Sequence, residues 1–185
     1  MNGIASLRTR NRAAWRGGIL QKGLLVAMFA AWLPSLLSAA TIILVRHAER
    51  SSAMSADSLL SPAGEERARQ LAQVLKDTGI QRIYVTEVRR TQQTAEPIAA
   101  RLHLTPVIIA QKDIDKLVSQ LESLGENETV LVVGHSNTVP LIIERLGAGK
   151  ASPMGEAEYD RLTVLFTPTG GKARVVTLRY GKPAE

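Results

Sequence analysis

Two of the three histidines in this chain directly follow strongly apolar segments, and both are accompanied by groups that suit an oxyanion. His47 stands next to Arg46 at the end of one apolar run, and His135 ends another. Arg90 lies at the start of a predicted helix. Arginine offers a planar fork of N–H donors that matches phosphate oxygens, and a neutral imidazole can act as a nucleophile. These residue types favour an anion-binding site that contains a nucleophile.

Short β-branched runs alternate with helical stretches from residue 41 onward, and this alternation predicts where the candidate residues lie. The predicted strands cover 41–45, 82–86, 106–110, 129–133, 162–166 and 174–178. The predicted helices are one that opens at Ser61-Pro62 and stops at Gly79, followed by 90–102, 114–124 and 139–146. The pattern predicts a single three-layer α/β/α domain with a mostly parallel sheet, helices on both faces and an antiparallel pair at one edge. Ligands bind beyond the carboxyl ends of the strands in such sheets, which is where both histidines fall.

Three motifs resemble those of the histidine phosphatase superfamily, also called the phosphoglycerate mutase-like family. The segment 45–49 (VRHAE) looks like the Arg-His-Gly signature of the family, with Ala in place of Gly. The segment 90–95 (RTQQTA) is similar to its Arg-x-x-Gln-Thr-Ala motif, and 133–136 (VGHS) looks like its second-histidine motif. The motifs occur in the family's order, and the resemblance runs over essentially all of residues 41–180. It implies the phosphoglycerate mutase-like fold.

The resemblance also implies a role for each matching residue. His47 would be the nucleophile that takes the phosphoryl group as a phosphohistidine. Arg46 and Arg90 would bind the non-bridging phosphoryl oxygens, His135 would complete that pocket, and Arg50 would have a supporting role in substrate binding. Phosphoryl transfer depends mainly on positioning and on neutralising oxygen charge, so these groups suffice without a metal or another cofactor.

Four carboxylates are candidates for the general acid. Cleavage of an ordinary phosphate ester requires an acid that protonates the leaving oxygen. Glu87 ranks first because it ends the second predicted strand, three positions before Arg90. Asp113 and Asp115 are alternatives, because a related acid in many members of the family comes from the segment after this helix and strand. Glu49 is the remaining alternative, although a carboxylate beside arginines also suits a simple ion pair.

A metal centre is a different use of the same residues. His47, Glu49 and His135 would be its ligands. The nearby arginines would repel a divalent cation, so we predict that the chain has no metal ligands.

The net charge of +6 belongs to the first forty residues, which hold five basic residues and no acidic ones. Residues 41–185 contain 18 bases against 17 acids, a net charge of +1. Nucleic acid is therefore not an expected partner. Three basic residues of the first predicted helix, Arg67, Arg69 and Lys76, are predicted to lie solvated on its exposed face.

Residues 1–40 have the pattern of a secretory signal peptide. A basic segment precedes an uncharged apolar run of 15 residues (23–37), and Ser38-Ala39-Ala40 supplies small residues at the cleavage site. Cleavage after Ala40 would leave a domain of residues 41–185, periplasmic or secreted, with no stable membrane anchor. An uncleaved N-terminal anchor is the alternative. The chain has no cysteine, which excludes disulfides, thiolate metal sites and a cysteine nucleophile.

These observations predict a phosphatase that hydrolyses small phosphomonoesters through a phosphohistidine on His47. A phosphohistidine phosphatase and a phosphoglycerate mutase-like phosphotransferase are alternatives within the same chemistry, although a mutase needs a closing lid. A non-catalytic phosphate- or phosphosugar-binding module is an alternative of a different class. Phosphosugars, nucleotides, lipid-linked phosphates and phosphohistidine are all compatible substrates. The segment 51–60 is predicted to form a flexible rim over the site.

Overall fold

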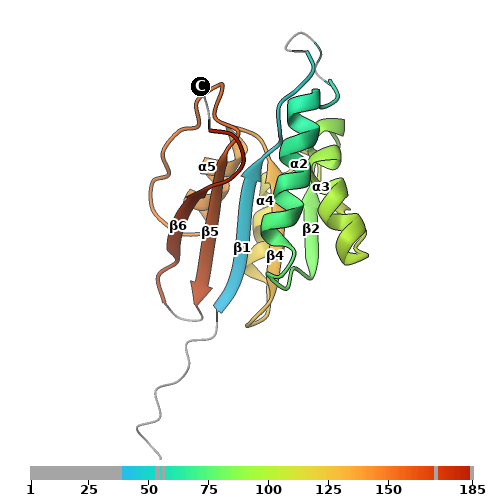
Figure 1. Ribbon diagram of the computed structural model, residues 1–185. Coiled ribbons are helices and arrows are strands. Elements are labelled where there is room, and N and C mark those ends of the chain that lie inside the picture. Colours follow the sequence, from blue (N-terminus) through green and yellow to red (C-terminus); the bar gives the residue numbers. More distant parts are fainter. Residues whose placement is uncertain (1–38, 53–54, 56, 169–170, 184–185) are drawn as a thin grey trace, which may run out of the picture. The chain divides into compact units, whose positions relative to one another are not determined.

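The computed structural model describes residues 39–52, 55, 57–168 and 171–183, so residues 1–38 of the predicted leader lie outside the described part. The described residues form a six-stranded sheet between two layers of helices (Figure 1). The predicted three-layer α/β/α domain is confirmed. Within the described ranges, no helix combines the length and the apolarity needed to cross a bilayer.

The sheet has the strand order β3-β2-β4-β1-β5-β6. Its strands are β1 (Ala39–Arg46), β2 (Arg82–Val85), β3 (Val107–Ile108), β4 (Thr129–Gly134), β5 (Arg161–Pro168) and β6 (Arg174–Arg179). The pairs β1–β4, β4–β2 and β2–β3 are parallel, whereas β1–β5 and β5–β6 are antiparallel. The predicted antiparallel pair at one edge is therefore confirmed. β3 is shorter than the predicted strand 106–110.

In the described part of the chain, four helices cover the sheet: α2 (Pro62–Leu75), α3 (Arg89–Leu102), α4 (Ile114–Glu122) and α5 (Thr138–Arg145). α2 and α3 lie on one face, and α4 and α5 on the other (Figure 1). α2 begins as its sequence indicates, because the Ser61 hydroxyl accepts a hydrogen bond from the Gly64 amide at 3.1 Å and Pro62 occupies the first turn. α3 continues past Pro97.

The apolar runs of β1 and β4 are buried on both faces, as expected for strands between two helical layers. Ile43 and Val45 of β1 belong to one core cluster, which includes residues of α2 and α3. Ile42 and Leu44 point to the opposite cluster, which includes residues of α4 and α5. This double burial fixes the two central strands, and the chain leaves both of them at the same edge of the sheet.

The N-terminus of α2 packs tightly against the segment that follows β1. The Ser61 amide donates a hydrogen bond to the Glu49 carbonyl at 2.9 Å. A Cβ atom on Gly64 would lie only 2.2 Å from that same carbonyl oxygen, so this helical position accommodates glycine alone without a backbone shift. The contact anchors the chain two residues beyond His47.

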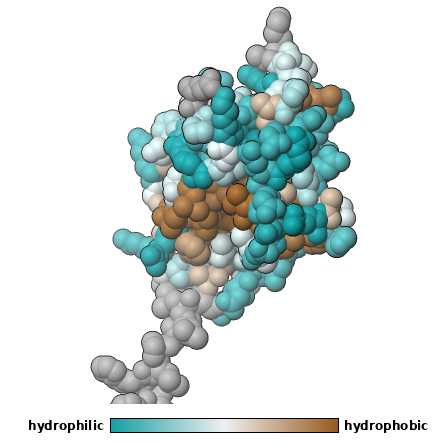
Figure 2. All heavy atoms as spheres, viewed as in Figure 1, coloured by the Kyte–Doolittle hydropathy of each residue, from teal (hydrophilic) through white to brown (hydrophobic). Residues whose placement is uncertain are grey.

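Among the described residues, no helix covers β6 and the adjoining part of β5 on the face that holds α2. All six residues of β6 are exposed, and Leu178 retains 50% of its surface. Apolar atoms gather over these two strands in Figure 2. One edge of the sheet therefore presents apolar surface to its surroundings.

Candidate active site

His47 and His135 meet at the carboxyl ends of the two central strands. Arg46 of β1 is in register with Gly134 of β4, so the next residue of each strand lies beside the other. The two imidazole rings have their centroids 5.3 Å apart at an interplanar angle of 65°, and the His47 amide donates to the Gly134 carbonyl at 2.9 Å. Both side chains are almost fully buried, with 4% and 3% of their surface exposed.

His47 is held in a form that suits a nucleophile. Its Nδ1 lies 2.8 Å from the Ala48 carbonyl oxygen. A carbonyl only accepts hydrogen bonds, so Nδ1 carries the proton and Nε2 keeps its lone pair. Burial, assisted by the positive charge of Arg90, lowers the pKa of His47 to about 3. The imidazole is therefore neutral at physiological pH.

The nitrogens of the Arg46 guanidinium have different surroundings. Its Nη1 donates to the carbonyl oxygens of Gly155 and Glu156, at 2.9 Å in each case. Its Nε is buried and has no hydrogen-bond partner among the described residues. A buried cationic N–H without an acceptor is costly, and a bound oxyanion would satisfy it. The Nε edge of Arg46 is thus the part that fits a phosphoryl oxygen.

Arg90 and His135 interact directly. An Nη2 of Arg90, in the first turn of α3, lies 3.3 Å from His135 Nδ1. Guanidinium nitrogens only donate, so Nδ1 accepts and neutral His135 carries its proton on Nε2, 3.1 Å from the Thr86 hydroxyl. Burial, followed by the charge of Arg90, lowers the pKa of His135 to about 4. His135 therefore orients Arg90 as a hydrogen-bond acceptor.

Arg50 and Glu87 lie at the margin of this cluster. Burial lowers the pKa of both Arg46 and Arg90, and the positive charge of the half-buried Arg50 adds to this lowering in each. The backbone of Arg50 forms a bridge with Leu60, which ties together the two ends of the predicted rim segment. Glu87 is exposed just after β2, and its negative charge partly opposes the lowering of the His135 pKa that burial and Arg90 cause. The structure therefore brings Glu87 close enough to His135 for an electrostatic interaction.

The three rival carboxylates are placed differently. Glu49 lies 2.8 Å from Arg67, and Asp115 forms an exposed ion pair with Arg145 at 2.7 Å. Asp113 is exposed at the start of α4. Among the described residues, no group of three or more His, Asp or Glu side chains is arranged to hold a metal ion.

The prediction that Arg67 is solvated is wrong. Arg67 is 5% exposed and binds both carboxylate oxygens of Glu49, while its remaining donors reach the carbonyl oxygens of Tyr180 and Lys182. Its position on the face of α2 shared with Gly64 and the core residues places it inward despite its charge. Arg69 is exposed, in agreement with the prediction.

Two side chains near the histidines, Thr86 and Tyr159, are not among the site residues predicted from the sequence. Thr86 accepts the hydrogen bond from His135. Its position directly after β2, at the carboxyl end of a strand, is where site residues are expected. Tyr159 stacks against Arg46 and lies with its ring centroid 6.0 Å from that of His47. It lies outside all three motifs, and its neighbours in the sequence give no indication of the contact.

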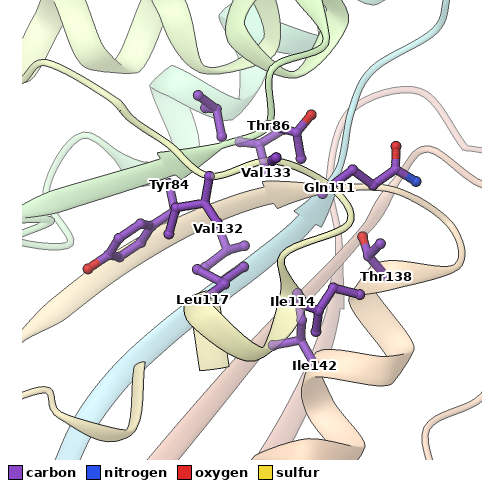
Figure 3. Close-up of a pocket in the computed structure, with 13 residues that line it drawn as sticks. Tyr84, Thr86, Gln111, Ile114, Leu117, Val132, Val133, Thr138 and Ile142 are labelled. Atoms are coloured by element: carbon purple, nitrogen blue, oxygen red, sulfur yellow. The ribbon is translucent and has the colours of Figure 1, made fainter. Parts of the chain in front are cut away.

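A small cavity of about 20 Å³ lies on the α4–α5 side of the same strand ends (Figure 3). Thr86 and Thr138 line it, with Gln111 beside otherwise mostly apolar neighbours. None of the predicted site residues is among its lining residues. Its size suits a single water molecule and not a substrate.

The low pKa values of the histidines predict a pH-dependent stability. His47 and His135 have folded-state pKa values of about 3 and about 4, below the value of 6.5 expected in the unfolded chain. The unfolded chain therefore takes up protons below pH 6.5 that the folded protein excludes, and stability is lost as pH falls through this window. Between pH 7.5 and 5.5, the free energy of unfolding should fall by about 1.4 kcal/mol for each histidine.

Urea denaturation at the two pH values measures this change. In the variant His47→Asn, about half of the decrease should disappear. A free energy of unfolding that is equal at both pH values in the unmodified protein would contradict the expectation.

Residues 42–112 match the family model described as histidine phosphatase superfamily (branch 1). A search of curated proteins gives no match. The chain is similar to the structure of a putative phosphohistidine phosphatase SixA from Nakamurella multipartitia, with a TM-score of 0.55, 22% identity, and coverage of 80% of this chain and 98% of that chain. It is also similar to the protein histidine phosphatase SixA complexed with tungstate, with a TM-score of 0.60, 20% identity, and coverage of 75% and 96%.

A third similar structure is a mycobacterial glucosyl-3-phosphoglycerate phosphatase in complex with inorganic phosphate. The TM-score is 0.58 at 17% identity, and the match covers 78% of this chain and 98% of that chain. At these identities the likeness establishes the fold, which is the phosphoglycerate mutase-like fold. The family match covers Arg46, His47 and Arg90, and ends before His135.

Proposed function

We propose that this chain is a phosphatase of the histidine phosphatase superfamily that hydrolyses phosphomonoesters through a phosphohistidine on His47. The observation that carries the proposal is the state of His47 beside Arg46. The imidazole is neutral, its Nδ1–H is bound to a carbonyl and its Nε2 keeps a lone pair, while the buried Nε–H of Arg46, the preceding residue, has no acceptor within the described part of the chain. A phosphoryl group supplies both the electrophile for Nε2 and the acceptor for Arg46.

The reaction proceeds in two displacements. In the first, His47 Nε2 attacks phosphorus, the bond to the ester oxygen breaks, and Glu87 gives its proton to the leaving alcohol. In the second, water attacks phosphorus in phospho-His47, the P–N bond breaks, and the proton of the water returns to Glu87. The products are an alcohol, inorganic phosphate and neutral His47.

The arginines stabilise charge in both steps. Arg46 and Arg90 bind the non-bridging oxygens, Arg50 adds positive charge at the rim, and His135 holds Arg90 through its Nδ1. Such groups are set in place before the reaction, so they stabilise the transition state without reorganising. The family match and the fold shared with several phosphatases support this assignment. The tungstate and phosphate named in two of the similar structures are tetrahedral oxyanions, as the proposed substrate group is.

Phosphohistidine is a second candidate substrate, favoured by the placement of Glu87. One carboxylate oxygen of Glu87 accepts a hydrogen bond from the Gln111 amide at 2.8 Å, and the side chain is exposed. The proposed acid is therefore more exposed to solvent than the buried nucleophile His47. An imidazole is a good leaving group and depends little on such an acid, so a phosphohistidine side chain fits the same site.

We also propose a periplasmic or secreted location for the enzyme. This proposal rests on the leader sequence alone, which combines a basic segment, a short apolar run and small residues at its end.

Steady-state hydrolysis of p-nitrophenyl phosphate between pH 4 and 8, with a label-trapping experiment, tests the proposed function. The full chain is mixed with ³²P-labelled substrate and quenched in alkali, in which phosphohistidine is stable. Turnover that survives an excess of chelator, with label on the peptide that contains His47, is the expected result. Binding of inorganic phosphate without turnover or label, for p-nitrophenyl phosphate and for a phosphohistidine peptide, would instead identify a binding module.

A further inference from the structure

We propose that the hydroxyl group of Tyr159 donates a hydrogen bond to the phosphoryl group of the substrate. Tyr159 would then be a substrate-contacting residue from a part of the chain that none of the motifs includes. The inference rests on the proposed function and deepens it, because it adds a neutral hydrogen-bond donor for the phosphoryl group to the donors that the arginines supply.

The ring of Tyr159 is held at the site by Arg46. The guanidinium carbon of Arg46 lies 4.1 Å from the ring centroid, within the range of a cation–π contact. The same guanidinium binds the carbonyl oxygens of Gly155 and Glu156, just before Tyr159 in the chain. The segment before β5 is therefore fixed to the strand end that carries His47, and the half-buried ring stands 6.0 Å from the His47 ring.

Tyr159 also lies close enough to both arginines that would bind phosphate to interact with each of them. Burial lowers the pKa of Arg46 and of Arg90, and the electrostatic interaction with Tyr159 partly opposes this lowering in both. Arg46 ends β1 and Arg90 lies in the first turn of α3, so Tyr159 is near the ends of both elements that supply the proposed phosphate ligands. A phosphoryl group bound to these arginines over His47 would be within the surroundings of the Tyr159 ring.

The hydroxyl is also available as a donor. The backbone amide of Tyr159 is bound to the Ala157 carbonyl, but its hydroxyl makes no hydrogen bond to any residue in the described ranges. A phosphoryl group has three non-bridging oxygens with several lone pairs each, more than the N–H groups of two arginines satisfy in a fixed geometry. A phenol at this position supplies one more preorganised donor, as oxyanion-stabilising groups do.

The phosphoryl group, and not the leaving group, is the assigned acceptor, because Glu87 is proposed to protonate the leaving oxygen. The two possible acceptors can be told apart by the effect of removing the hydroxyl on substrates with different leaving groups. Loss of a donor to the phosphoryl group affects good and poor leaving groups equally and weakens phosphate binding. Loss of a donor to the leaving oxygen affects only substrates with a poor leaving group.

The test compares Tyr159→Phe with the unmodified protein on p-nitrophenyl phosphate and on an alkyl phosphate, alongside calorimetric binding of inorganic phosphate. Phenylalanine keeps the ring that stacks on Arg46 and removes only the hydroxyl. We expect kcat/KM to fall roughly 10- to 100-fold for both substrates, and the Kd of phosphate to rise about 10-fold. Glu87→Gln should reduce turnover of the alkyl phosphate far more than that of p-nitrophenyl phosphate.

Tyr84→Phe is the matched control, because the hydroxyl of Tyr84 contacts Arg82 on β2 and no site residue. It should leave kcat/KM and phosphate binding unchanged. Unchanged values in Tyr159→Phe, or a loss confined to the alkyl phosphate, would overturn the inference. If the unmodified protein binds phosphate without turnover, the proposed function fails, and the phosphate affinities still decide the role of Tyr159.

Discussion

Replacement of His47 by asparagine is expected to lower kcat for p-nitrophenyl phosphate by roughly 10⁴-fold or more and to abolish the phosphoryl-enzyme, since loss of a covalent nucleophile has effects of this size. Asparagine can keep a hydrogen bond to the Ala48 carbonyl, but it has no nitrogen lone pair to attack phosphorus. Arg46 and Arg90 remain in place, so inorganic phosphate should still bind. Stopped-time assays and label trapping in alkali measure the two effects.

The variant His103→Asn is the control for this experiment. His103 is the one histidine of the chain that lies outside the proposed site. It caps the C-terminus of α3 in the left-handed conformation, with φ of 55°. Asparagine adopts this conformation readily, so the fold should be retained. His103→Asn should keep full activity and label, whereas label trapped in the His47→Asn variant would place the intermediate on another residue.

Replacement of Arg67 by alanine is expected to lower the free energy of unfolding by about 3–5 kcal/mol, the cost of removing one partner of a buried ion pair. Glu49 would lose the guanidinium that contacts both of its oxygens, and the carbonyls of Tyr180 and Lys182 would lose their donors. Urea denaturation at pH 7 measures the change.

Arg69→Ala provides a matched comparison two residues further along α2. Arg69 pairs with Glu66 on the surface, with 59% of its side chain exposed, and such pairs contribute less than about 1 kcal/mol. Equal destabilisation by the two substitutions would mean that the contacts of Arg67 add nothing beyond those of an exposed arginine.

The central part of the fold follows from local sequence. The apolar runs of β1 and β4 indicate strands covered on both faces, and the Ser61-Pro62 pair marks the start of α2. Histidines directly after two such strands are placed together by the geometry of a parallel sheet, and the structure does place His47 beside His135. The sequence pattern of each strand, and the position of a histidine directly after it, were enough to predict these two features, because each depends on a single element.

The remaining features depend on contacts between distant segments. The antiparallel pairing of β1 with β5 is set by the path of the chain after α5, which no local pattern encodes. Arg67 is buried because a carboxylate and two carbonyls converge on it, and its charge alone suggests solvent. Tyr159 reaches the site through the carbonyls that Arg46 binds, more than 100 positions away along the chain.

The order of the strands also determines which parts of the protein can open while the rest stays folded. β1 and β4 are hydrogen-bonded to a neighbour on each side, whereas β3 has two residues and β6 is fully exposed at the opposite edge. Regions with few buried contacts open at low free-energy cost, and central strands open only with the whole domain. Backbone amides in β1 and β4 should therefore exchange with solvent deuterium last. The strand ends that hold His47 and His135 keep their geometry through the local openings of both edges.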